Sequence, residues 1–77
     1  MFARTLAQDV ATVLRASDSL EVLEFGAGSG VLAADLIDAL DALGLVVRYT
    51  IIEVSADLRA VQRERLAAYG ARVIWRD

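Results

Sequence analysis

The chain has 77 residues, of which 57% are apolar, and its net charge is −3; it has no histidine, no cysteine and, among its eight basic residues, no lysine. This composition excludes disulfides, thiolate and imidazole chemistry, the usual zinc sites and a phosphate-loop lysine from these residues. The scattered arginines form no basic patch of the kind that binds nucleic acid, and the longest apolar run, residues 42–47, is far too short to span a membrane.

The sequence is unusually apolar for its length. A chain of this size hides only about 60% of its unfolded surface, too little to cover both its strands and their helices. We therefore expect residues 1–77 to be a single segment of a larger domain. The first residues do not resemble a secretory leader, so the predicted location is the cytoplasm or an organelle matrix.

Residues 2–16 show the spacing of an amphipathic helix. Its predicted apolar stripe consists of Phe2, Leu6, Val10, Val13 and Leu14. A turn at residues 17–19 follows. The nearly continuous apolar run of residues 20–25 then predicts a strand that is covered on both faces, as in a parallel sheet.

Three glycines on alternate positions, Gly26, Gly28 and Gly30, directly follow this strand. Glycine allows a positive φ and has no Cβ that would keep a ligand away from the backbone. A helical pattern starts right after Gly30, and the first N–H groups of a helix have no partner inside it. The stretch therefore predicts a strand that opens into a binding loop built from backbone.

The helix after the glycines is also amphipathic. Its predicted apolar face consists of Val31, Leu32, Leu36, Leu40 and Leu43. Asp35, Asp38 and Asp41 lie on another face, and we interpret them as a solvated helix surface and assign them no metal or other chemistry. Gly44 stands where a glycine commonly ends a helix.

A second and a third strand complete the pattern. Residues 45–52 are rich in β-branched residues and predict a strand that ends at Glu53. Ser55 is a good N-cap for a third helix, which Gly70 ends. The inward stripe of this helix is predicted to consist of Leu58, Val61, Leu66 and Tyr69. Residues 71–76 predict the third strand.

The order helix, strand, helix, strand, helix, strand predicts an α/β fold with parallel strands in the spatial order 3-2-1. This is the N-terminal half of a Rossmann-like, doubly wound sheet, incomplete as a domain. In such sheets the ligand lies over the C-terminal ends of the strands. The residues at those ends are residues 24–30, Glu53 and Asp77.

Two cofactor fingerprints fit the same glycines. The loop can be read as an acid, Glu24, followed by GxGxG, which describes S-adenosylmethionine sites, or as GxGxxA ending at Ala33, which describes dinucleotide sites. Glu53 fits both, because a carboxylate roughly twenty residues after the loop can accept hydrogen bonds from ribose hydroxyls.

Glu24 separates the two alternatives. A carboxylate about 5 Å from a pyrophosphate would cost on the order of 3 kcal/mol at an effective dielectric constant of 20. S-adenosylmethionine carries an ammonium and a sulfonium group, to which the same carboxylate is complementary. We therefore favour S-adenosylmethionine and keep an NAD- or FAD-binding oxidoreductase half-domain and a non-catalytic Rossmann-like interaction domain as alternatives.

At these residues the sequence resembles the class I S-adenosylmethionine-dependent methyltransferases and, among them, the MidA-type family. The resemblance is carried by FARTLA at 2–7, LEFGAGSG at 23–30, YTIIEVSADLR at 49–59 and QRERL at 62–66. It implies a protein methyltransferase; the mitochondrial relatives modify an arginine of a respiratory complex I subunit. By this analogy the partner is a protein substrate, and the location is the bacterial cytoplasm or the mitochondrial matrix.

The site assignments follow from the loop and the strand ends. Glu24 and the loop amides would hold the methionine end of the cofactor, Glu53 the ribose, and Asp77 the adenine amino group. The residues predicted to bind the cofactor are Glu24, Gly26, Ala27, Gly28, Gly30, Glu53, Val54 and Asp77. No residue is predicted to act as a catalytic base or a metal ligand, so this segment would hold the methyl donor only.

Overall fold

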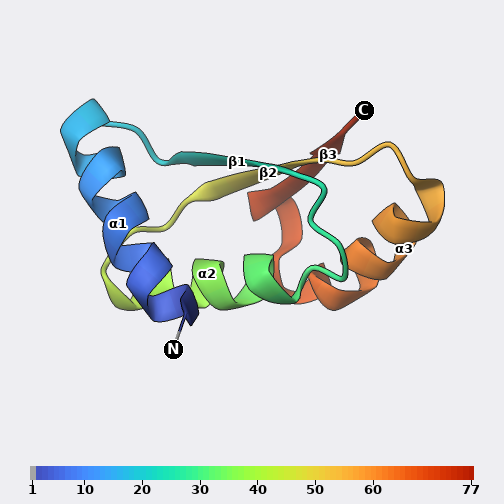
Figure 1. Cartoon of the computed structure of the whole chain (residues 1–77), viewed down its shortest axis with the longest axis horizontal. Coiled ribbons are helices and arrows are strands. Elements are labelled where there is room, and N and C mark those ends of the chain that lie inside the picture. The colour runs from blue at the N-terminus through green and yellow to red at the C-terminus, as the bar shows by residue number, and fades with distance from the viewer. Residues whose placement is uncertain (1) are drawn as a thin grey trace.

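The computed structural model describes residues 2–77, with side chains from residue 5 onward, so the predicted stripe residue Phe2 lies outside the described side chains. The elements alternate as predicted (Figure 1). They are α1 (Phe2–Ser17), β1 (Glu21–Phe25), α2 (Val31–Ala42), β2 (Arg48–Ile52), α3 (Ala56–Arg65), the 3-10 helix η1 (Ala67–Arg72) and β3 (Val73–Arg76).

The three strands form one parallel sheet in the order β1-β2-β3. This confirms the predicted α/β fold and strand order. Two backbone hydrogen bonds extend the pairing beyond the strands, from Gly26 N to Ile52 O and from Glu53 N to Arg76 O, both 3.0 Å long. The segments that follow β1 and β2 therefore start side by side at one edge of the sheet.

The helices lie on one side of the sheet (Figure 1). The central strand β2 is buried there through Tyr49 and Ile51, and α1 packs against α2. The buried apolar core consists of Ala7, Ala11, Leu14, Ala27, Ala33, Leu36, Ile37, Leu40, Val47, Tyr49, Ile51, Leu66 and Val73. The core thus lies between one face of the sheet and its helices.

The other face of the sheet is uncovered within the described residues. Residues of β1 alternate between exposed and half-buried, and Leu23 and Phe25, the latter 74% exposed, are on the exposed side. Ile74 of β3 is exposed as well. Within these residues β1 is covered on one face only, because their helices pack on one side of the sheet; cover of the second face stays a prediction for the larger domain.

The buried face of α2 differs in part from the predicted one. Leu36 and Leu40 are buried as expected, but Ile37 is buried as well, whereas Val31 and Leu43 at the ends are exposed. Because α2 packs against both the sheet and α1, its buried surface is wider than predicted and includes Ile37. Gly44 follows the helix with a φ of 79°, as expected of a glycine that ends a helix.

The acidic face of α2 is solvent-exposed, as predicted, and it also anchors η1. The hydroxyl of Tyr69 donates to Asp38 over 2.8 Å, and Arg72 forms an ion pair with Asp41 at 2.7 Å. Burial, helped by the hydrogen bond to Asp38, raises the pKa of Tyr69 to about 12. These contacts tie the segment before β3 to α2.

The predicted inward stripe of the third helix is confirmed for Leu66, which is 1% exposed, and for Tyr69, which packs against the core, but it is wrong in α3 itself. Leu58 and Val61 are 40% and 45% exposed, and the buried residue of the helix is the polar Gln62. Ser55 caps the helix as predicted, accepting a hydrogen bond from the Leu58 amide at 3.2 Å. The side of α3 that carries Gln62 faces the sheet, because the Gln62 amide forms hydrogen bonds there with Gly28, Glu53 and Trp75.

Candidate functional site

The glycine loop connects β1 to α2 with a positive φ at all three glycines. A Cβ built on Gly26 or Gly28 would have no atom within 4 Å, so the loop faces open space at these positions. Gly30 differs, because its Cβ would lie 3.5 Å from Leu66 and 3.7 Å from the Cα of Gln62. Gly26 and Gly28 thus leave room for a ligand, whereas Gly30 lets α3 approach.

Two of the loop amides already have acceptors. Gly26 N donates to Ile52 O, and Gly30 N donates to Ala27 O at 3.0 Å. Ala27 is itself buried in the core. These contacts fix the shape of the loop, so hydrogen bonds from the loop to a ligand would come from the residues between them.

Glu24 lies on the helix-covered face of β1 and is half-buried. The hydroxyl of Tyr49 donates to its Oε1 at 2.6 Å. Burial of Tyr49, together with its hydrogen bond to Glu24 and the negative charge of that carboxylate, raises the pKa of the hydroxyl far above its ordinary value of 10. The phenol therefore stays a donor, and it holds one carboxylate oxygen of Glu24 in place.

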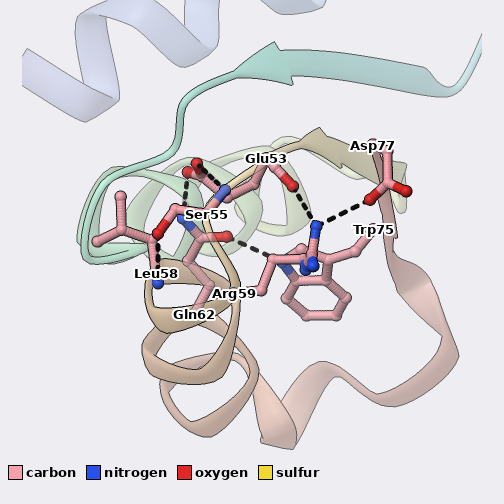
Figure 2. Close-up of polar contacts among 7 residues, drawn as sticks. All are labelled: Glu53, Ser55, Leu58, Arg59, Gln62, Trp75 and Asp77. Carbon is pink, nitrogen blue, oxygen red and sulfur yellow. Dashed lines mark hydrogen bonds and ion pairs between the residues drawn. The ribbon is translucent and has the colours of Figure 1, made fainter.

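Glu53 follows β2, and its side chain is buried, with only 6% of the residue exposed. Its Oε1 accepts from Nε2 of Gln62 at 2.9 Å and its Oε2 accepts from the Ser55 amide at 3.3 Å (Figure 2). A buried carboxylate needs such partners. The predicted ribose anchor is thus an acid held from two sides rather than a solvated strand end.

Asp77 and Val54 complete the set of predicted residues. Nη1 of Arg59 donates both to Glu53 O at 2.7 Å and to Oδ1 of Asp77 at 2.8 Å, so Arg59 links the ends of β2 and β3 (Figure 2). The side chain of Asp77 is 91% exposed, and Val54 is also exposed. Both side chains are therefore accessible to a ligand at this edge.

The structure places Glu24 in β1, next to its last residue, and the other predicted cofactor residues in the loop after β1 and directly after β2 and β3. Sequence reasoning missed three residues that support them, Tyr49, Arg59 and Gln62. For Gln62 a signal existed, since it lies four residues from both Leu58 and Leu66, at helical spacing with the predicted stripe. Tyr49 gave no signal because its partner Glu24 is 25 residues away. Arg59 gave none because periodicity does not show that an arginine side chain bonds the backbone of Glu53 and the carboxylate of Asp77.

Among residues 2–77 there is no group of three or more metal-ligating side chains. No helix in the same range is long and apolar enough to cross a membrane.

A sequence profile of S-adenosyl-L-methionine-dependent methyltransferases matches residues 1–77, the whole chain. The chain belongs to this family. The match decides between the two interpretations of the glycine loop in favour of S-adenosylmethionine. Because this family uses that methyl donor, the predicted cofactor and enzyme class are confirmed at the level of the family.

Two solved structures from Burkholderia thailandensis are similar to the chain. One was solved in its native form and the other with S-adenosyl-homocysteine bound; both are 52% identical in sequence, with TM-scores of 0.90 and 0.89. Each comparison covers 99% of this chain, but only 22% and 21% of the solved chains. The chain thus spans about a fifth of the length of these relatives.

Parts of two fungal enzymes are also similar. A non-reducing polyketide synthase of Macrophomina phaseolina is 41% identical over 75 residues, and the citrinin polyketide synthase of Monascus ruber is 34% identical over 64 residues. The matches cover 88% and 83% of this chain, but only 3% and 2% of the synthases. The similarity therefore concerns one small part of each synthase.

Proposed function

We propose that these residues form the methyl-donor-binding part of a methyltransferase. The observation that carries the proposal is the open space over Gly28, in a loop that Gln62 links to the buried carboxylate of Glu53. A solved neighbour with 52% identity binds S-adenosyl-homocysteine, which supports the assignment. Glu24 and the loop would hold the methionine end, Glu53 the ribose and Asp77 the adenine amino group.

The residues present fit this cofactor by charge. S-adenosylmethionine brings a sulfonium and an ammonium group, and Glu24 provides a carboxylate at the start of the loop whose Oε1 is already fixed by Tyr49. A second oxygen of the same carboxylate can accept from a cationic donor, and such charge-assisted bonds are the stronger ones. A pyrophosphate at this place would instead be repelled.

The bound sulfonium supplies an activated methyl group, whose bond to sulfur breaks as the bond to the acceptor forms. The task of these residues is to hold the donor so that acceptor, methyl and sulfur can align. The carboxylates described here are assigned to binding. The segment would therefore position the donor, and we assign none of its residues as a general base.

The finer part of the proposal is a MidA-type methyltransferase that acts on a protein. It is supported by the resemblance of the EVSADLR and QRERL stretches to that family. By the same analogy the acceptor would be an arginine of a respiratory complex I-type subunit, and the location the bacterial cytoplasm or the mitochondrial matrix.

Calorimetric titration of the full-length protein tests the donor site. We expect heat with S-adenosyl-homocysteine and none with NADH. Binding of NADH alone would favour the dinucleotide-binding alternative, and binding of neither ligand would favour an interaction domain without catalysis. Transfer of a labelled methyl group to a protein, followed by amino-acid analysis, then tests whether the acceptor is arginine.

A further inference from the structure

Gln62 is a fully buried polar residue, 0% exposed, at the sheet edge that carries the predicted site. It is the buried residue of α3, a helix whose other residues are at least partly exposed. Burying an amide is unfavourable unless its donors and acceptor are hydrogen-bonded. The partners of Gln62 therefore indicate why a polar residue stands at this position.

The amide of Gln62 makes three hydrogen bonds, each to a different segment. Nε2 donates to Gly28 O at 2.8 Å. Figure 2 shows the other two bonds: Nε2 donates to Oε1 of Glu53 at 2.9 Å, and Oε1 of Gln62 accepts from Nε1 of Trp75 at 2.9 Å. Carbonyl and carboxylate oxygens can only accept and an indole N–H can only donate, so the partners fix the orientation of the amide. One side chain thus joins the glycine loop, the residue after β2, and β3.

The other contacts around Glu53 do not replace this one. Arg59 donates to the main-chain oxygen of Glu53 and so fixes the end of the strand, not the carboxylate. The Ser55 amide reaches Oε2 at 3.3 Å, which is longer than the 2.9 Å bond from Gln62. Gln62 therefore provides the shorter of the two bonds that orient the carboxylate.

We propose that Gln62 is a positioning residue for the methyl donor. It holds the carboxylate of Glu53 and the backbone of Gly28 at a fixed separation, so that the ribose and the methionine end of the cofactor meet their partners together. Groups that are oriented before binding lose less conformational freedom when the ligand arrives. The inference rests on the proposed function and adds a residue that acts through Glu53 and the loop.

The first test replaces Gln62 with methionine, which has a similar length but no donor. We expect Gln62→Met to lower the affinity of the full-length protein for S-adenosyl-homocysteine about tenfold or more, measured by calorimetry. The control is Leu40→Ala, a fully buried residue near the far end of α2 whose loss lowers stability. Leu40→Ala should keep the wild-type affinity.

The outcomes separate this inference from the proposed function. A folded Gln62→Met variant with wild-type affinity overturns the positioning role and leaves the donor site intact. An equal loss of affinity in Leu40→Ala also overturns it, since the effect then follows stability. A wild-type protein that does not bind S-adenosyl-homocysteine overturns both proposals.

A second variant, Gln62→Glu, keeps the shape of the side chain and remains informative should Gln62→Met fail to fold. Two carboxylates at this distance repel each other when both are charged, whereas at low pH a proton on one of them restores a hydrogen bond between the two side chains. We expect the affinity of this variant, relative to wild type, to fall as the pH rises. A pH-independent ratio contradicts the inference.

Three further charged side chains, Arg59, Arg65 and Asp77, lie near this pair. Arg59 lies between Glu53 O and Asp77, and Nε of Arg65 donates to Ser29 O at 3.0 Å. Arginine keeps its charge throughout the range in which carboxylates titrate. Asp77 is present in wild type and variant alike, so its contribution cancels in the ratio of affinities.

A double-variant cycle tests whether Gln62 acts through Glu53. If it does, Gln62→Met combined with Glu53→Gln should bind S-adenosyl-homocysteine within about twofold of the weaker single variant. If the double variant instead loses affinity by the product of the two single-variant factors, the residues act independently, and the positioning role is wrong.

Discussion

The hydroxyl of Tyr49 lies 2.6 Å from Oε1 of Glu24 and donates to it from the buried face of β2. A tyrosine of the sheet core thus supports an acid at the mouth of the glycine loop. This contact, the loop and the buried acid after β2 each lead to a measurable consequence.

Replacement of Tyr49 by phenylalanine should destabilise the protein by about 1.5 to 3 kcal/mol, because a half-buried carboxylate loses a donor. Denaturant unfolding monitored by circular dichroism measures this change. Tyr69→Phe is the matched control, since its hydroxyl donates to Asp38 at the surface, and its cost should be smaller. If both variants lose the same unfolding free energy, the hydrogen bond to Glu24 contributes no more to stability than the surface bond to Asp38.

Gly28→Ala should weaken S-adenosyl-homocysteine binding without preventing folding. The new methyl group would lie in open space, where we place the ligand, and the positive φ of 57° adds strain of about 1 to 2 kcal/mol. Gly44→Ala is the matched control, with a φ of 79° and equally open surroundings after α2. If the two variants bind the ligand equally well, the loop assignment is wrong.

Glu53→Gln should lower the affinity for S-adenosyl-homocysteine by roughly tenfold or more, because charge-assisted bonds of about 1.5 to 3 kcal/mol are lost. A cofactor analogue that lacks the ribose 2′-hydroxyl should bind the wild type weakly, but it should bind the variant almost as well as the parent ligand does. If the losses in binding free energy from the substitution and from the missing hydroxyl add in full, Glu53 does not contact the ribose. Thermal unfolding must accompany the titration, because this acid is buried.

Alkaline pH should unfold the protein through its two tyrosines. Both have an ordinary pKa of 10, which burial raises to about 12 for Tyr69 and further for Tyr49. The folded state therefore binds these protons more tightly than the unfolded state. Its stability is unaffected below pH 10 and falls as the pH rises from 10 toward 12. Tyrosinate absorbance and circular dichroism should change together; ionisation of both tyrosines near pH 10 in a folded protein would contradict this.

Residues 1–77 expressed alone should self-associate, because Leu23, Phe25 and Ile74 expose apolar side chains on one face of the sheet. Sedimentation measures the association. Replacing Leu23 and Ile74 with threonine, which keeps a good strand former, should reduce it. A monomer with a sharp, cooperative thermal transition would contradict this prediction, because the segment would then fold with its apolar sheet face exposed to water.

The order and direction of the elements could be predicted because they depend on local patterns. The β-branched run before Glu53, the cap at Ser55 and the glycines after Phe25 each specify one local structure. The beginning of β2 was placed three residues too early, at residue 45, because apolar character alone does not show where pairing with β1 begins.

The interior of the site could not be predicted in the same way. Apolar periodicity assigns Leu58 and Val61 to the inside of α3. Gln62 shares the helical spacing of Leu58 and Leu66, but this spacing does not distinguish an amide that is buried with partners from one that is exposed. The burial of Gln62 depends on partners at Gly28 and Trp75, 34 and 13 residues away. Such contacts arise only when the chain is folded, so the sequence indicated the acids and glycines of the site but not the side chains that hold them.

Trp75 gives the chain an optical property. It is the single tryptophan of these 77 residues. Its indole nitrogen donates to Gln62, and the guanidinium of Arg63 lies 4.8 Å from the centre of its ring. Indole emission responds to hydrogen bonding and to nearby charge. A shift of the Gln62 amide on ligand binding should therefore change the emission of Trp75, which makes this residue an intrinsic fluorescent reporter that needs no added label.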